Sequence, residues 1–216
     1  MIAFILATLL CLPLYAEENK AKVTQDFIVK ITKDLPYIET QELGQKVIIQ
    51  RIQDPTHKLS DDYSKTSLPC PPFCIQPTNI DKKIETIGEL ELLNFIKIEN
   101  NDTQKALLID ARLASAYLKE SIPSADNIPY DRVQNLDKAS MAKIFTLFGM
   151  KSDTEGKWDF SKAKKLIIFS HAIYCDQSKQ LIQTLTKHGY PKNLLYYYRS
   201  GLQGWKLLGL STRMGS

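Results

Sequence analysis

A serine and a cysteine stand at the two ends of a short segment that follows an apolar run. The segment reads Ser170-His171-Ala172-Ile173-Tyr174-Cys175, and residues 166–169 before it are apolar. A helix-like pattern over residues 176–188 follows it and is closed by Gly189. A loop between a strand and a helix N-terminus presents unpaired backbone N–H groups, which suit an anion, a thiolate or a persulfide. The pattern therefore predicts a loop built for anion or sulfur chemistry.

Cys175 and His171 are the side chains that could react in this loop. Cys175 stands at the predicted helix start, where the helix dipole and the unpaired N–H groups favour a thiolate. His171 precedes it in the loop and could add positive charge or accept a proton. A phosphatase loop is excluded, because it needs an arginine six positions after its cysteine, where this chain has Leu181.

The loop must be positioned by the elements around it, and from residue 84 onwards helical and extended patterns alternate. Strand-like runs cover residues 106–110, 126–128, 166–169 and 195–198, and helical patterns cover residues 113–119, 136–148, 176–188 and 202–208. This alternation predicts an α/β fold with a parallel sheet flanked by helices. Ligands of such sheets bind beyond the carboxyl ends of the strands, so Asp110, Ser170 and Arg199 are expected at one rim.

A further helix is expected just before the first of these strands. Residues 86–89, Thr-Ile-Gly-Glu, have the form of a capping box. The helix that follows would place Leu90, Leu93 and Ile96 on one face.

Residues 17–83 have a different character. Residues 27–31 alternate as a half-buried strand does, and residues 37–43 and 46–52 form a predicted β-hairpin that turns at Gly44. Five of the ten prolines fall between residues 54 and 77, where periodicity is weak. We expect a small β-rich arm and a linker pinned by Cys70 and Cys74, without a second large core.

The first 16 residues are almost wholly apolar and end at Ala16, before the charged Glu17-Glu18. They fall short of the roughly 20 apolar residues that span a bilayer. They are typical of a cleavable signal peptide, which predicts export to a bacterial periplasm and no stable membrane span afterwards. An uncleaved N-terminal anchor or a buried helix is the alternative.

Composition narrows the function classes. Hydrophobic residues make up 44% of the chain and charged residues 24%, as in a soluble globular protein. The net charge of +4 is spread without a basic run that could follow a phosphate backbone, so no nucleic-acid partner is expected.

Cleavage of the signal would remove Cys11 and leave an odd number of cysteines in an oxidising compartment. Cys70 and Cys74 could form a local disulfide, either could pair with Cys175, or both could bind a metal with His57. The prolines at 71 and 72 stiffen the turn between them and favour a structural role. The rest of a zinc set with normal spacing is missing around His57, so neither a metal nor another cofactor is expected.

Three separated motifs resemble the rhodanese-like domain in the order that this family has. They are Leu108-Ile-Asp110-Ala-Arg112 with the later Ile122-Pro-Ser-Ala-Asp-Asn-Ile-Pro129, the strand, loop and helix over residues 166–189, and Tyr198-Arg199-Ser-Gly201-Leu-Gln-Gly-Trp205. The resemblance covers about residues 84–212. It divides the chain into a signal peptide (1–16), an arm and linker (17–83) and a rhodanese-like domain (84–212). The segment Cys70-Pro-Pro-Phe-Cys74 is similar to one found ahead of such domains in some exported bacterial proteins.

The resemblance implies transfer of a sulfane sulfur, from a donor such as thiosulfate to a thiophilic acceptor, through a cysteine persulfide. The family's nucleophile position maps to Ser170 and the closing position of its loop maps to Cys175; Ile173 replaces the usual loop glycine. Serine cannot carry a persulfide, so thiosulfate sulfurtransferase activity is expected to be weak or absent, with any remaining chemistry at Cys175. Asp110 and Arg112 would form an internal brace.

Two other functions stay open at the level of sequence. One is a non-catalytic module that binds an anion or a periplasmic protein through residues 170–175. The other is a thiol–disulfide component in which Cys175 works with Cys70 or Cys74. Under the sulfur-transfer hypothesis, the partners would be a small sulfur donor and a thiol acceptor.

Overall fold

The structure is a computed structural model that describes residues 27–102, 105–152 and 157–214. The expected signal peptide, with Cys11, and the first residues of the arm lie outside the described residues. Within the described ranges, no helix is long and apolar enough to cross a membrane.

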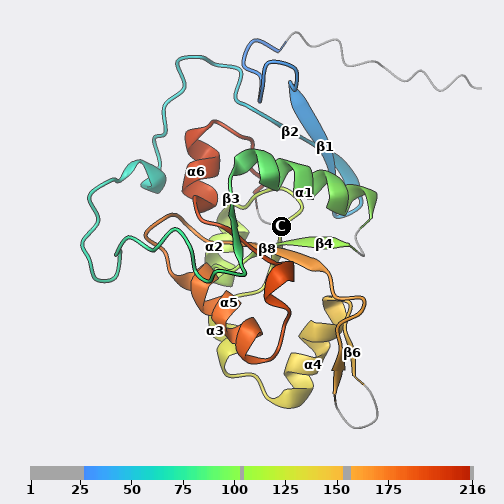
Figure 1. Ribbon diagram of the computed structural model, residues 1–216. Coiled ribbons are helices and arrows are strands. Elements are labelled where there is room, and N and C mark those ends of the chain that lie inside the picture. Colours follow the sequence, from blue (N-terminus) through green and yellow to red (C-terminus); the bar gives the residue numbers. More distant parts are fainter. Residues whose placement is uncertain (1–26, 103–104, 153–156, 215–216) are drawn as a thin grey trace, which may run out of the picture.

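A five-stranded parallel sheet forms the centre of the molecule, as the alternating pattern predicted (Figure 1). The strand order is β3-β9-β8-β4-β5. The strands are β3 (Glu85–Ile87), β4 (Ala106–Asp110), β5 (Asp126–Asn127), β8 (Lys165–Phe169) and β9 (Leu195–Tyr198). The central strands are apolar on both faces because helices cover both, which is the usual environment of a parallel sheet.

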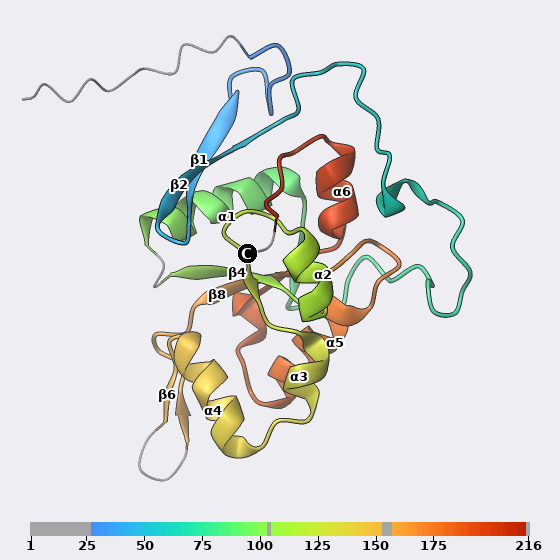
Figure 2. The ribbon, with the colours of Figure 1, turned by 180° about the vertical axis from the view of Figure 1, so that it is seen from behind.

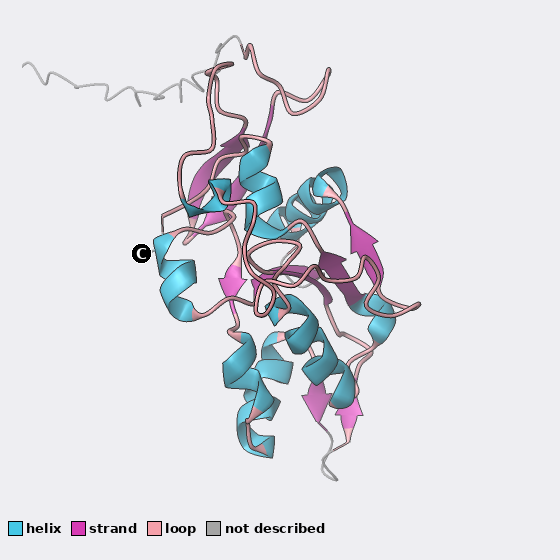
Figure 3. Cartoon of the chain, turned by 90° about the vertical axis from the view of Figure 1, so that its left-hand side faces the viewer, coloured by secondary structure: helices cyan, strands magenta, loops and turns pink. Residues whose placement is uncertain are grey.

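One face of the sheet is covered by α1 (Glu89–Asn101) and α6 (Gly201–Leu207), and the other by α3 (Tyr130–Gln134), α4 (Lys138–Leu147) and α5 (Gln177–Lys187). Figures 2 and 3 show the helices on both sides of the sheet. Alternate residues of β8 enter the two cores, since Ile167 packs on the α1 side and Ile168 on the α5 side. The short helix α2 (Ala114–Lys119) buries none of its residues. A small antiparallel pair, β6 (Lys151–Ser152) and β7 (Trp158–Asp159), was not expected from the sequence.

The predicted hairpin in the arm is confirmed. Strands β1 (Tyr37–Glu42) and β2 (Gln45–Gln50) are antiparallel and joined by Leu43 and Gly44, which both have positive φ values, of 49° and 78°. Two central residues in this conformation make the tight turn whose twist suits a hairpin. Ile38 and Ile49 are buried in the same core as α1 and α6, so the hairpin extends that core.

The strand expected over residues 27–31 does not form. Side chains alternate between half-buried and exposed as predicted, but within the described residues the backbone pairs with no neighbouring strand. The Gln53 amide takes that place: its Oε1 accepts from the N–H groups of Ile28 and Val29, and its Nε2 donates to the Val29 carbonyl at 2.9 Å. Alternation of side chains was therefore insufficient evidence for a strand.

The capping box was assigned to the wrong residues. Thr86 lies in β3 and its hydroxyl donates to the Thr78 carbonyl, whereas the helix is capped at Gly88, whose N–H donates to the Glu91 carboxylate at 3.1 Å. Leu93 and Ile96 are buried as expected, but Leu90 is 48% exposed. The buried face of the helix is formed by Leu92, Leu93 and Ile96 instead.

Candidate functional site

The predicted rim lies at the carboxyl ends of three adjacent strands. In the register of the sheet, Asp110 of β4 pairs with Phe169 of β8, and Phe169 pairs with Tyr198 of β9. Ser170 and Arg199 are the next residues along β8 and β9. The loop of residues 170–175 therefore begins between the ends of its two neighbouring strands, where ligands of parallel sheets bind.

Four successive carbonyl groups of this loop are held by specific donors. The carbonyls of Ser170 and His171 accept from the N–H groups of Leu202 and Gln203, in the first turn of α6, at 3.0 and 2.8 Å. The Ala172 carbonyl accepts from the N–H of Cys175 at 2.9 Å, and the Ile173 carbonyl from the N–H of Gln76 in the arm at 2.8 Å.

Because a trans peptide points its N–H opposite to its C=O, these bonds also fix four N–H groups. The N–H groups of residues 171–174 point away from the donors that hold the preceding carbonyls, and in the described part of the chain they donate to no other group. Gly201 permits the close approach of α6, since a Cβ on this residue, at φ +61°, would lie 2.5 Å from the Ser170 carbonyl oxygen. The loop thus offers unpaired backbone donors that suit an anion.

Ser170 is buried at the start of the loop, with 2% of its surface exposed. Its Oγ lies 3.1 Å from the Oγ of Ser178 in the first turn of α5. A hydroxyl in this position can hydrogen-bond to an anion. It cannot become a nucleophilic alkoxide at neutral pH without a base, and the atom that it contacts is a second hydroxyl.

Cys175 and His171 are brought together as the sequence suggested. The Cys175 Sγ lies 3.7 Å from the His171 Nδ1, and Cys175 is the one free cysteine in the part of the chain that the structure describes. Burial, assisted by the positive charge of Arg112, lowers the pKa of His171 to about 4. The ring is therefore neutral at pH 7. His171 therefore supplies no positive charge to the loop at pH 7, and the same lowered pKa makes its ring a weak acceptor for the thiol proton.

This histidine should make the stability of the protein depend on pH. Its folded-state pKa of about 4 lies below the unfolded value of about 6.5, so the unfolded state binds more protons between these pH values. We expect the free energy of unfolding to fall by on the order of 2–3 kcal/mol from this group as the pH drops from 7 to 4. Urea unfolding of wild type and His171→Gln at both pH values measures the difference. His57→Gln, at an exposed histidine, is the matched control, and its free energy of unfolding should fall as much as that of wild type between the two pH values. An equal fall in wild type and His171→Gln would contradict this expectation.

Asp110 and Arg112 form a buried ion pair, with side chains 0% and 2% exposed. The Arg112 Nη2 lies 2.6 Å from the Asp110 Oδ2, and its Nη1 donates to the Tyr63 hydroxyl at 2.9 Å. The same Nη2 also donates to the Glu120 carbonyl. The pair therefore joins the end of β4 to the end of α2 and to the arm, and its contacts are those of a structural element.

In the arm, Cys70 and Cys74 form a disulfide, which is the first of the three arrangements considered for these cysteines. Sequence reasoning missed the contacts that the arm makes with the loop. Tyr63 lies against the His171 ring, Phe73 packs edge-on against Tyr174, and Gln76 binds the Ile173 carbonyl. The arm has little periodicity, and the Gln76 bond uses the backbone, so no residue pattern could have revealed them.

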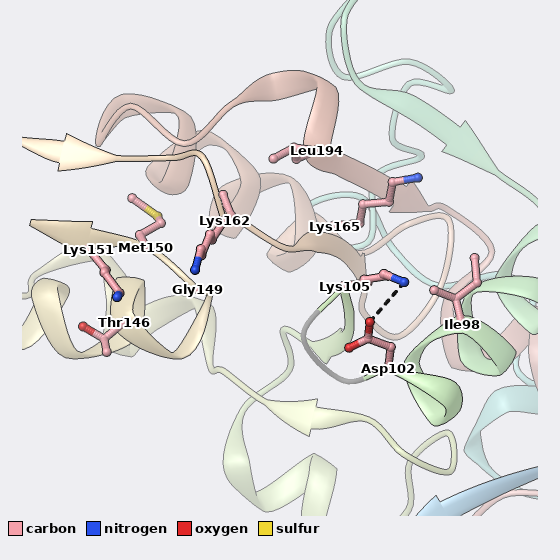
Figure 4. A pocket seen from close by; sticks show the side chains of 11 residues that line it. Ile98, Asp102, Lys105, Thr146, Gly149, Met150, Lys151, Lys162, Lys165 and Leu194 are labelled. Carbon is pink, nitrogen blue, oxygen red and sulfur yellow. Dashed lines mark ion pairs between the residues drawn. The ribbon is translucent and has the colours of Figure 1, made fainter.

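Two of the cavities in the described part of the molecule lie at opposite ends of the strands. A cavity of about 480 Å³ lies between the arm, α2 and the loop, with Tyr63, Phe73, Arg112, His171 and Tyr174 among its lining residues. A larger one, of about 1000 Å³, lies by the amino ends of β4 and β8 and is lined by four lysines (Figure 4). There Lys105 pairs with Asp102, and Lys165 lies over the rings of Phe95 and Tyr196. Of these two, the smaller cavity is the one that adjoins the loop of residues 170–175, through His171 and Tyr174.

Comparisons with known proteins agree with the three sequence motifs described above. A sequence profile described as "Rhodanese-like domain" matches residues 97–208, which is more than half of the chain. No curated protein matches.

Three solved structures illustrate the similarity. A rhodanese with anions from E. coli is 21% identical, with a TM-score of 0.34, and the match covers 51% of this chain and 99% of that one. A human single-domain sulfurtransferase is 18% identical, with a TM-score of 0.38, over 56% of this chain and 94% of that one. A thiosulfate sulfurtransferase from Pseudomonas aeruginosa is 18% identical, with a TM-score of 0.41, over 62% of this chain and 21% of that one. By its profile match, with the loop at the carboxyl edge of its parallel sheet, this chain belongs to the rhodanese-like domain family.

Proposed function

We propose that this protein is an exported rhodanese-like protein in which sulfane sulfur is carried by Cys175, with weak or absent thiosulfate sulfurtransferase turnover. The observation that carries the proposal is that a serine stands at the first position of the loop and a cysteine at its last. A buried serine occupies the position of the family nucleophile, and the free thiol stands at the other end, 3.7 Å from a neutral histidine.

The proposed step balances without a cofactor. The Cys175 thiol loses its proton to solvent, with the neutral His171 ring 3.7 Å from the sulfur, and the Cys175 thiolate attacks the outer sulfur of thiosulfate. The S–S bond of thiosulfate breaks, sulfite leaves with its electron pair, and Cys175 holds a persulfide. An acceptor such as cyanide or a thiol then takes the terminal sulfur and returns the thiolate.

Turnover is proposed to be weak because the sulfur stands at the wrong end of the loop. Unpaired N–H donors follow Ser170 directly, from residue 171 onwards, whereas the N–H of Cys175 itself is used in a bond to Ala172. An electrostatic cradle accelerates a reaction only where the charge develops, so a displaced thiolate gains less from it.

Export is part of the proposal, and two features support it. The first 16 residues read as a signal peptide, and a disulfide such as Cys70–Cys74 persists in oxidising compartments. A periplasmic location would supply the expected partners, a small sulfur donor and a thiol or protein acceptor.

The test is thiosulfate-to-cyanide turnover of purified wild type and Cys175→Ser, with peptide mass spectrometry to locate bound sulfur. We expect low turnover in wild type, a persulfide on Cys175 after incubation with thiosulfate, and loss of both in Cys175→Ser. Rapid turnover that survives the Cys175→Ser change would overturn the assignment of the sulfur carrier.

A second candidate function is a non-catalytic module that binds an anion or a protein partner, and the unpaired N–H groups of residues 171–174 favour it. Anion binding that persists in Cys175→Ser, without any persulfide in wild type, would select it. A thiol–disulfide role with the arm is less favoured, since Cys70 and Cys74 are bonded to each other and Cys175 is free.

A further inference from the structure

The arm contacts three of the six loop residues, from outside the family-matched segment. The ring centroids of Tyr63 and His171 lie 6.4 Å apart, and those of Phe73 and Tyr174 lie 5.6 Å apart. The Gln76 N–H donates to the Ile173 carbonyl at 2.8 Å. The stretch of residues 61–77, here called the strap, therefore lies along the loop that leads to Cys175.

Gln76 is the point at which the strap is held most firmly. Its carbonyl accepts from the Arg199 Nη2 at 2.8 Å, and its side-chain Oε1 accepts from the Lys179 Nζ at 2.9 Å. Its Nε2 donates to the Cys74 carbonyl at 2.9 Å. One residue thus ties the loop, helix α5 and the end of β9 to the disulfide.

The other anchor of the strap is Tyr63. Its hydroxyl accepts from Arg112 at 2.9 Å and its carbonyl accepts from the Gln203 side chain at 2.6 Å. The Cys70–Cys74 disulfide lies between the two anchors and closes a small ring of residues that includes Phe73, the residue packed on Tyr174. The disulfide therefore fixes the part of the strap that crosses the loop.

We propose that the strap controls access to Cys175, and that reduction of the Cys70–Cys74 disulfide opens it. The inference rests on the proposed function for the importance of the Cys175 thiol. The reductant is a dithiol: one of its thiolates attacks a disulfide sulfur, and the other cysteine leaves as a thiolate and takes a proton. The second thiol of the reductant then resolves the mixed disulfide, so that the reductant is oxidised and Cys70 and Cys74 become thiols.

Reduction removes a constraint on residues 70–74 without removing any side chain. The freed residues regain conformational freedom, so the Phe73 ring is no longer held rigidly against Tyr174. The bonds of Gln76 to Arg199 and Lys179 remain and keep the end of the strap in place. A sequence-local cross-link is suited to this role because its loss alters one stretch of the chain and leaves the sheet intact.

The experiment measures how fast iodoacetamide alkylates Cys175 in the full chain, by following the peptide that contains this residue with mass spectrometry. Oxidised wild type is compared with wild type reduced by dithiothreitol and freed of it, and with Cys70→Ser/Cys74→Ser. We expect alkylation to be about 10-fold faster in both open forms. Arg199→Gln, which removes the bond to the Gln76 carbonyl and keeps the disulfide, should give an intermediate rate.

Ile75→Ala is the matched control, because Ile75 adjoins Gln76 and its side chain is 76% exposed. It should alkylate at the rate of oxidised wild type. Equal rates in oxidised and reduced wild type would overturn the proposal, and this comparison decides even if the double variant fails to fold. Alkylation of Cys175 requires no sulfur transfer, so the two proposals fail separately. Faster alkylation after reduction, without a persulfide on Cys175, would refute only the proposed sulfur-carrying function. A persulfide on Cys175, with equal alkylation rates before and after reduction, would refute only the control of access by the strap.

Discussion

Ser170→Cys should raise thiosulfate-to-cyanide turnover by about 100-fold or more over wild type, since loss of a nucleophile from a complete site costs still larger factors. The substitution replaces the Ser170 hydroxyl with a thiol at the start of the loop, where the unpaired N–H groups of residues 171–174 follow directly. A thiolate at this point is favoured by those donors and by the N-terminus of α5, and it can carry a persulfide as an alkoxide cannot.

Steady-state turnover and mass spectrometry of the loop peptide measure this gain. Ser170→Ala is the control, because it removes the hydrogen bond to Ser178 without adding a thiol and should leave turnover low. The double variant Ser170→Cys/Cys175→Ser has a loop thiol at position 170 alone, so it separates turnover at this position from turnover at position 175. If Ser170→Cys takes up no sulfur while the protein stays folded, the loop lacks the geometry of a working cradle, and the replacement of the usual glycine by Ile173 becomes the next feature to test.

Arg112→Ala should lower the free energy of unfolding by about 3–5 kcal/mol, the range measured when one partner of a buried ion pair is removed. The Asp110 carboxylate is fully buried and would keep one side-chain partner, the hydroxyl of Ser121, at 2.8 Å. The change also breaks the bonds to the Glu120 carbonyl and to Tyr63, so the end of β4, the end of α2 and the strap lose a shared anchor.

Urea unfolding followed by circular dichroism gives this free energy from the midpoint and slope. Lys65→Ala is the matched control, since Lys65 makes the ion pair with Asp62 at the surface, with side chains 64% and 91% exposed. It should leave stability unchanged within error, because solvent screens such pairs. If Arg112→Ala lowered the free energy of unfolding no more than Lys65→Ala does, the structural role of the Asp110–Arg112 pair would be refuted.

Elements with strong local signals could be predicted from the sequence. Strands β4, β8 and β9 are apolar runs that end at turns, and the hairpin is marked by Gly44. The parallel sheet with helices on both faces followed from the alternation of strands and helices, whereas the order of its strands did not. The loop at residues 170–175 could be located for the same reason, since a buried strand and an amphipathic helix bound it.

Elements that depend on distant partners could not be predicted. Strand β3 is only three residues long and exists because it pairs with β9, so Thr86 looked like a helix cap. Residues 27–31 show the reverse case: their pattern is that of a strand, but their backbone bonds to the Gln53 amide and not to a partner strand. The neutral state of His171 depends on its burial and on Arg112, which neither the loop sequence nor its spacing contains.

The position of β3 has a consequence for how the boundary of this protein is drawn. The family profile begins at residue 97, which lies inside α1, whereas the edge strand of the sheet ends ten residues earlier, at Ile87. The hairpin residues Ile38 and Ile49 complete the core on the same side. The segment that matches the family profile is therefore smaller than the unit that physically assembles. A fragment cut at the profile boundary would start in mid-helix, lack a strand, and expose the apolar surface that the arm covers.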